Sequence, residues 1–178
     1  VDDRNISSGN WHGVYYIGAS NLTIKNNFFG VDISGNTAIG NGSEGIYGGD
    51  ATTGVNPAEG SSFTGVESSL NVAILNNVVS GNLRNAINLS AGTNPSSSTS
   101  GVIQGNLIGV GVDGITALGN TAAGIWNTVS YPVTYLIGGT GAGEANIIAN
   151  NGTDGIDNRG NGSGLTVSAN SIYANGGL

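Results

Sequence analysis

Aromatic and polar side chains recur at one position of a repeated triplet, and this position is the first candidate for chemistry. Five triplets each combine a small residue, an apolar residue and a variable residue, and the variable ones are Tyr15, Tyr47, Asn88, Trp126 and Asp157. Because each follows a Val or Ile expected to point inward, two-residue alternation predicts that all five point outward. Aromatic rings in line with amide and carboxylate groups are a candidate sugar-binding strip.

The same rings have a second interpretation. The inserted segment 48–69 begins directly after Tyr47. A loop of this kind can fold over the rings and bury them as a satellite cluster. Its position favours cover by the loop, and the sugar-binding strip stays as the alternative.

Paired carboxylates are the residues that could catalyse cleavage of a polysaccharide. Asp154 and Asp157 are three residues apart and flank Ile156, so their side chains are expected to point to different places. Glycosidases need two carboxyl groups that face each other across roughly 5–10 Å. The residue aligned with Asp157 in the neighbouring repeat is Trp126. We therefore assign no catalytic residue and expect a protein without enzymatic activity.

The basic residues offer little to a catalytic site. His12 is the only histidine, and without a cluster of partners it is interpreted as a corner residue rather than a ligand or general base. The remaining basic residues are scattered, which suits neutralisation of uronic acids poorly: Arg4, Lys25, Arg84 and Arg159.

Two glycine-rich stretches resemble ligand-binding loops but lack the required context. Residues 109–114 fit G-x-G-x-x-G, yet no helix is predicted after them to receive a pyrophosphate. Residues 138–144 do not continue into the nine-residue repeat of a calcium-binding β-roll. No cofactor and no metal site are expected.

Composition excludes several partners. The net charge is −7, only 8% of residues are charged, and Cys is absent. Such a surface has no patch that neutralises phosphates, so neither nucleic acid nor an anionic membrane is an expected partner. No apolar run approaches the roughly 18 residues of a membrane span. Disorder stays as a minor alternative, although short apolar pairs recur throughout the chain.

A long internal repeat organises the chain. Residues 27–47 return without a gap as residues 106–126, and ten residues are unchanged between the two blocks. Across the whole chain, an Asn followed by an apolar residue within two positions marks each cycle of about three short strands. These landmark residues are Asn5, Asn27, Asn77, Asn106, Asn146 and Asn170.

This pattern predicts an all-β fold, a right-handed parallel β-helix of about five to six coils with inserted loops. Glycine and asparagine suit the corners, where the backbone often needs positive φ. A landmark Asn at the same place in successive coils is expected to form an amide ladder. A β-sandwich or barrel is the rival all-β fold, but it does not explain a block that returns without a gap.

Residues 106–120 and 136–148 resemble the repeats of secreted and surface-anchored bacterial parallel β-helix proteins, which form a pectate-lyase-like solenoid. The resemblance covers most of the chain except residues 48–69 and 90–100. It departs at Val31-Asp32 and Val110-Gly111, where those repeats usually carry Thr-Asp. It implies a β-helix and an extracellular or cell-surface location. Members differ in function, so the fold does not supply one.

The sequence supports two possible functions. We interpret residues 1–178 as a single segment of a longer array, with a structural or adhesive role. Its open coil ends predict end-to-end stacking on itself or on further coils. The alternative is a polysaccharide-binding or polysaccharide-degrading module that uses the outward aromatic column.

Overall fold

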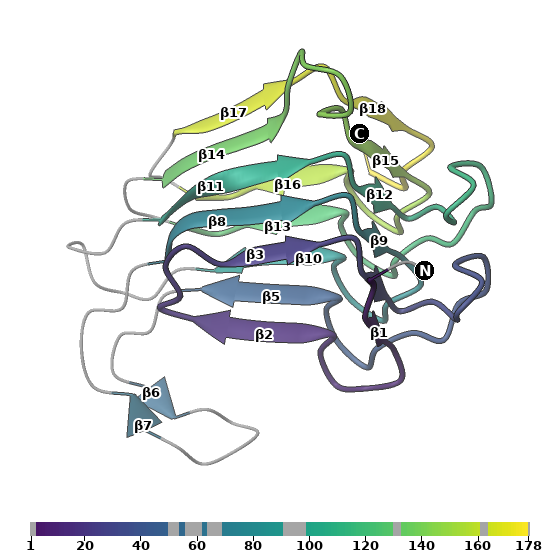
Figure 1. Ribbon diagram of the computed structural model, residues 1–178, viewed down its shortest axis with the longest axis horizontal. Coiled ribbons are helices and arrows are strands. Elements are labelled where there is room, and N and C mark those ends of the chain that lie inside the picture. The colour runs from purple at the N-terminus through teal and green to yellow at the C-terminus, as the bar shows by residue number, and fades with distance from the viewer. Residues whose placement is uncertain are drawn as a thin grey trace.

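The computed structural model describes residues 3–49, 54–55, 62–63, 69–90, 99–129, 133–160 and 164–177. Sixteen short strands in this part of the chain form three parallel sheets that stack around one core (Figure 1). The described residues contain no helix, so none there has the length and apolar character that crossing a membrane would take. The predicted all-β parallel β-helix is confirmed.

Each coil contributes one strand to each sheet, in the order A, B, C. Sheet A holds β1 (Ile6–Ser7), β4 (Phe28–Phe29), β9 (Val78–Val79), β12 (Leu107–Ile108), β15 (Ile147–Ala149) and β18 (Ser171–Tyr173). Sheet B holds β2 (Val14–Ile17), β5 (Ile46–Gly49), β10 (Ile87–Ser90), β13 (Ile125–Asn127) and β16 (Ile156–Asn158). Sheet C holds β3 (Thr23–Lys25), β8 (Ser69–Leu75), β11 (Thr99–Gln104), β14 (Val133–Gly138) and β17 (Leu165–Ser168).

The described strands therefore make five coils and the first strand of a sixth, which agrees with the five to six predicted. The insertion between β5 and β8 contributes a separate antiparallel pair, β6 (Gly54–Val55) with β7 (Ser62–Phe63). Every other strand pairing is parallel and joins one coil to the next.

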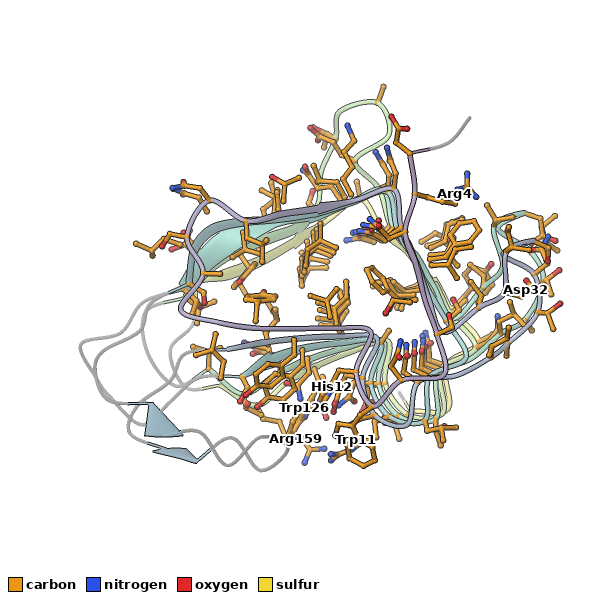
Figure 2. The ribbon with its side chains drawn as sticks, turned by 60° about the horizontal axis from the view of Figure 1, so that its bottom comes forward. Arg4, Trp11, His12, Asp32, Trp126 and Arg159 are labelled. Carbon is orange, nitrogen blue, oxygen red and sulfur yellow. The ribbon has the colours of Figure 1, made fainter. Side chains whose placement is uncertain are left out.

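The core consists of aliphatic side chains stacked in register. In sheet B, Ile46, Ile87 and Ile125 are aligned and fully buried. Sheets A and C add parallel columns, so the interior is a stack of similar apolar layers, visible along the coil axis in Figure 2. Burying these side chains is the main source of stability, at roughly 25 cal/mol per Å² of apolar surface.

The landmark asparagines form the predicted ladder at the corner between sheets C and A. From Asn27 onward, the side-chain oxygen of each landmark Asn accepts from the landmark Asn one coil earlier. The donors are that residue's backbone N–H and side-chain amide, at 2.8–3.2 Å. The amide of the later residues also donates to the backbone of the preceding coil. The ladder supplies partners to corner groups that burial would otherwise leave unpaired.

A second asparagine ladder lies at the corner between sheets A and B. The side-chain amide of Asn82 donates to Asn120 Oδ1 at 2.9 Å, and the same contact joins Asn120 to Asn151. The sequence prediction missed this ladder, because two of its members were interpreted only as loop residues of the long repeat. Its members are Asn10, Asn41, Asn82, Asn120, Asn151 and Asn175.

The long repeat forms two small hairpins that project from the corner between sheets A and B. They close at the bridges Val31–Ala38 and Val110–Ala117. Their tips touch across an intervening coil, where Val112 N–H donates to Gly35 O at 2.9 Å. Gly30 and Gly35, and their counterparts Gly109 and Gly114, have positive φ, which explains the recurrence of these glycines through backbone geometry.

Candidate functional site

The five variable triplet residues form one line on the outer face of sheet B. The strand register pairs Tyr15 with Tyr47, Tyr47 with Asn88, Asn88 with Trp126, and Trp126 with Asp157. Each comes directly after an inward Val or Ile, so their backbone positions face away from the core. We call this line the sheet B column. Four steps of about 4.8 Å give it a length of about 19 Å.

The N-terminal end of the sheet B column, on β2 and β5, is an aromatic cluster. The rings of Tyr15 and Tyr47 stack with centroids 5.1 Å apart and planes 18° from parallel. The imidazole of His12 lies 5.5 Å from the first ring and 5.4 Å from the second. Tyr15 is 39% exposed, and both Tyr47 and Trp126 are half-buried. Aromatic faces are therefore partly open to solvent on this side of the coil.

The prediction that an inserted loop covers these rings concerns residues 48–69. Most of that segment lies outside the described residues. Cover by the loop therefore stays a prediction.

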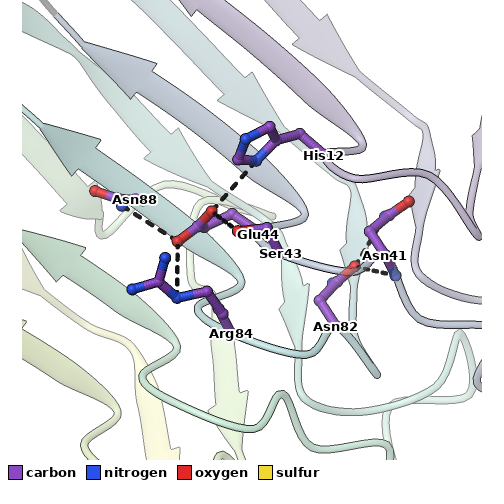
Figure 3. Close-up of polar contacts among 7 residues, drawn as sticks. All are labelled: His12, Asn41, Ser43, Glu44, Asn82, Arg84 and Asn88. Carbon is purple, nitrogen blue, oxygen red and sulfur yellow. Dashed lines mark hydrogen bonds and ion pairs between the residues drawn. The ribbon is translucent and has the colours of Figure 1, made fainter. Parts of the chain in front are cut away.

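A buried carboxylate lies beside the sheet B column. Glu44 is only 1% exposed, and four side chains converge on it (Figure 3). Ser43 Oγ donates to Glu44 Oε2 at 2.6 Å, and Asn88 Nδ2 donates to Oε1 at 3.4 Å. His12 Nδ1 lies 3.2 Å from Oε2, and Arg84 Nε lies 3.7 Å from Oε1. We call these five residues the Glu44 cluster.

The interpretation of His12 as a histidine without partners is wrong, since the Glu44 carboxylate lies against its ring. The contact has ion-pair distance without in-line hydrogen-bond geometry, because Nδ1 makes no regular hydrogen bond. A signal for it was present in the sequence. His12 and Glu44 both stand directly before the small residue of their triplets, and the backbone bond from Gly13 N–H to Glu44 O aligns these positions in consecutive coils.

Burial lowers the pKa of His12 below its ordinary value of 6.5. The negative charge of Glu44 opposes this shift in the pKa, and the positive charge of Arg84 adds to it. The lowered pKa favours the neutral imidazole, which packs as a third ring beside the tyrosines.

The C-terminal end of the sheet B column, on β13 and β16, borders a groove of about 240 Å³. Trp126 and Asp157 line it together with two arginines, Arg84 from the third coil and Arg159 from the fifth. Figure 2, viewed along the coil axis, shows Trp126, Arg159, His12 and Trp11 on the same outer side of the coil. The other lining residues are small or polar: Asn85, Ala122, Ala123 and Thr153.

The carboxylate of Asp157 is engaged by Arg159. Arg159 Nε donates to both of its oxygens, at 2.8 and 3.0 Å, and Arg159 Nη2 lies 2.8 Å from Oδ2. The expectation that the basic residues are scattered is also wrong, since two of the four arginines and lysines face one groove. Arg84 and Arg159 are 75 residues apart, so the lengths of the turns between them decide whether they meet. No local motif signals that they do.

Within the described residues, no group of three or more His, Asp or Glu side chains is gathered to hold a metal ion. Comparison with known proteins adds no assignment: no family model, no curated protein and no solved structure matches this chain. What the arrangement offers chemically is a row of rings with two exposed arginines beside it on a stiff sheet, while the amide of Asn88 is buried and donates to Glu44. Such a surface is suited to binding an extended polar ligand.

Proposed function

We propose that this chain is a structural segment of an extracellular or cell-surface protein that binds a polysaccharide along the outer face of sheet B, without cleaving it. The observation that carries the proposal is the sheet B column, in which three aromatic rings, an amide and a carboxylate follow one another in register. An extended chain of sugars presents apolar ring faces and hydroxyl edges. The three rings suit the apolar faces, and the exposed guanidinium groups of Arg84 and Arg159 beside them can donate to hydroxyl oxygens. Asn88 is only 3% exposed and Asp157 is bound by Arg159, so neither is open to the ligand.

Stiffness of the platform supports this proposal. Tyr47, Asn88 and Trp126 sit on strands with parallel partners on both sides, whereas Tyr15 and Asp157 sit on the edge strands β2 and β16. An asparagine ladder fixes the adjacent corner between sheets A and B. A pre-ordered surface pays little conformational entropy when a ligand binds. A binding role also needs no catalytic pair, and Asp157 is already engaged by Arg159.

The direct test is a binding screen against neutral and acidic polysaccharides, with release of reducing or unsaturated ends measured in parallel. We expect binding without release, and weakening of about tenfold or more in Trp126→Ala, because anchoring aromatics dominate binding energy. Tyr173→Ala is the matched control, since Tyr173 is an exposed aromatic on sheet A. Absence of binding to every polymer, or equal loss in both variants, contradicts the proposal.

Exposure of the rings is tested separately by acrylamide quenching. Trp11→Phe leaves Trp126 as the single indole, since the chain has only two tryptophans. A binding strip predicts efficient quenching, and protection of the indole by added polysaccharide. A shielded indole in the free protein favours loop cover instead and counts against the strip.

End-to-end stacking is a second candidate, and the last coil favours it. Ile156, Leu165, Val167 and Ile172 line a hollow of about 530 Å³ there, and the last two are nearly half exposed. Their counterparts in the inner coils are fully buried. A further coil, from the same polypeptide or from a second copy, would bury this apolar surface and pair the edge strands.

Sedimentation velocity over a wide concentration range tests stacking. We expect self-association that Ile172→Lys suppresses, because the substitution puts a charge into the contact. Ile33→Lys adds the same charge at an exposed hairpin tip and serves as the control. A compact monomer at high concentration counts against stacking by this chain.

A further inference from the structure

The charges around the groove beside Trp126 are layered. The side chains of Arg84 and Arg159 are 60% and 69% exposed, whereas their carboxylate partners Glu44 and Asp157 are 1% and 14% exposed. The negative groups therefore lie beneath, and the positive groups face the solvent. From this layering we infer that the groove recognises an anionic sugar residue, one that carries a carboxylate or a sulfate. The inference rests on the proposed polysaccharide binding and specifies its ligand class.

The guanidinium groups keep donors for such a ligand. Arg84 turns its Nε toward Glu44, and neither of its Nη atoms has a partner among the described residues. Arg159 uses Nε and Nη2 on Asp157, which leaves Nη1 without one in the same part of the chain. Planar guanidinium edges match carboxylate and sulfate oxygens in shape and charge. Each carboxylate thus holds its arginine in place, and the outer edge of the guanidinium group stays available to a ligand.

The two arginines flank an aromatic ring, which suits a charged sugar more than a free ion. Trp126 belongs to the fourth coil, and Arg84 and Arg159 come from the coils on either side of it. A sugar ring stacked on the indole would therefore present its acidic substituent toward a guanidinium on one side or the other. A neutral sugar would need an accessible acceptor for its hydroxyls, and the carboxylate of Asp157 is largely buried and already bound by Arg159.

The net charge of −7 makes this local arrangement more informative. A chain with this net charge repels an anionic polymer at long range, but charges beyond about 8 Å are largely screened at physiological salt. Recognition would then depend on short contacts in the groove. Two of only four arginines and lysines lie there.

Matched polymer pairs test the inference. Polygalacturonate is compared with its methyl ester, and dextran sulfate with dextran, by affinity electrophoresis and calorimetry at two salt concentrations. We expect the anionic member of at least one pair to bind about tenfold more tightly, with the advantage shrinking at high salt. A preference confined to polygalacturonate identifies the carboxylate as the recognised group, and one confined to dextran sulfate identifies the sulfate.

Variants locate the effect. The double variant Asp157→Asn/Arg159→Gln removes both charges of that ion pair together and is expected to remove about tenfold of affinity for the anionic member. Arg84→Gln would leave Glu44 buried without its cation, so Glu44→Gln/Arg84→Gln likewise removes both charges. The two double variants are expected to weaken binding of the anionic member alike, provided that their melting temperatures show a folded chain. Lys25→Gln is the control, because Lys25 is an exposed cation on sheet C.

The outcomes separate this inference from the proposed function. Equal binding of charged and neutral polymers, or unchanged discrimination in the arginine variants, overturns the anionic preference but leaves polysaccharide binding intact. Failure of all four polymers to bind, together with no effect of Trp126→Ala in the wider screen, overturns the proposed function and this inference with it.

Discussion

The first asparagine ladder and the sheet B column are built alike, with one residue per coil aligned in register, yet their residue types behave in opposite ways. The ladder uses asparagine in all six coils. The column uses tyrosine twice and then asparagine, tryptophan and aspartate. The difference reflects what the backbone demands at each place.

At the ladder position, the backbone needs a donor and an acceptor at a fixed reach. The Oδ1 of Asn106 accepts from both the N–H and the side chain of Asn77, while its amide donates to the carbonyl oxygens of Ile74 and Gln104. Aspartate has no donor, and glutamine is one methylene too long. The column position makes no such demand, because its strand bonds run through the backbone alone. Asn88 and Asp157 instead contact individual partners, Glu44 and Arg159, and the aromatic types at the other three positions are free to follow the chemistry of a ligand.

Breaking the ladder should give the largest effect. Asn106→Ala removes a fully buried side chain and leaves several backbone and amide groups of neighbouring coils unpaired. At roughly 1–3 kcal/mol for each buried unpaired group, we expect a loss of about 3–5 kcal/mol in the free energy of unfolding. Chemical denaturation followed by circular dichroism measures it.

Asn170→Ala is the matched control for that experiment. Asn170 makes the same kinds of bond at the last coil, but it is only part-buried, so water can replace the lost partners. Its loss is expected to be about 1 kcal/mol. Equal losses at the two positions would mean that burial does not control the strength of the ladder.

The fold was predictable because its signals are local and repeated. Each coil carries its landmark Asn and its triplet, and both reflect constraints that the coil imposes at every turn. The column followed from the same triplets, since two-residue alternation fixes which side a residue faces. The same triplets align His12 with Glu44, which the sequence prediction missed. The arginine groove did not follow, because Arg84 and Arg159 come from different coils and stand at different positions relative to their triplets.

Replacing one column residue by another that the column already contains should have a smaller effect. Tyr47→Asn places at the second coil the residue found at the third. It removes the stacking with Tyr15 and some apolar burial, so we expect a loss of about 1–2 kcal/mol in the free energy of unfolding. Thermal and chemical unfolding measure it. A loss as large as that of Asn106→Ala would show that the column is structural rather than free to vary.

The smallest expected effect is the pH dependence contributed by His12. Burial makes the folded pKa of His12 lower than its unfolded value near 6.5, so the unfolded chain binds the proton more readily. The stability gained from the neutral imidazole is present above pH 6.5 and is lost as the pH falls from there toward the folded pKa. His12→Asn should remove this part of the pH dependence.

Because the chain has a single histidine, one NMR titration of its ring protons reports the folded pKa directly. Glu44→Gln removes the charge that holds the pKa of His12 up, so its midpoint should fall further. Arg84→Gln removes a charge that lowers the pKa, so its midpoint should rise. A midpoint above 6.5 in the unaltered protein would mean that Glu44 outweighs burial and that His12 is a cation near neutral pH. The N-terminal end of the sheet B column would then carry positive charge as well as aromatic surface. It would resemble the arginine groove more than an uncharged stack of rings.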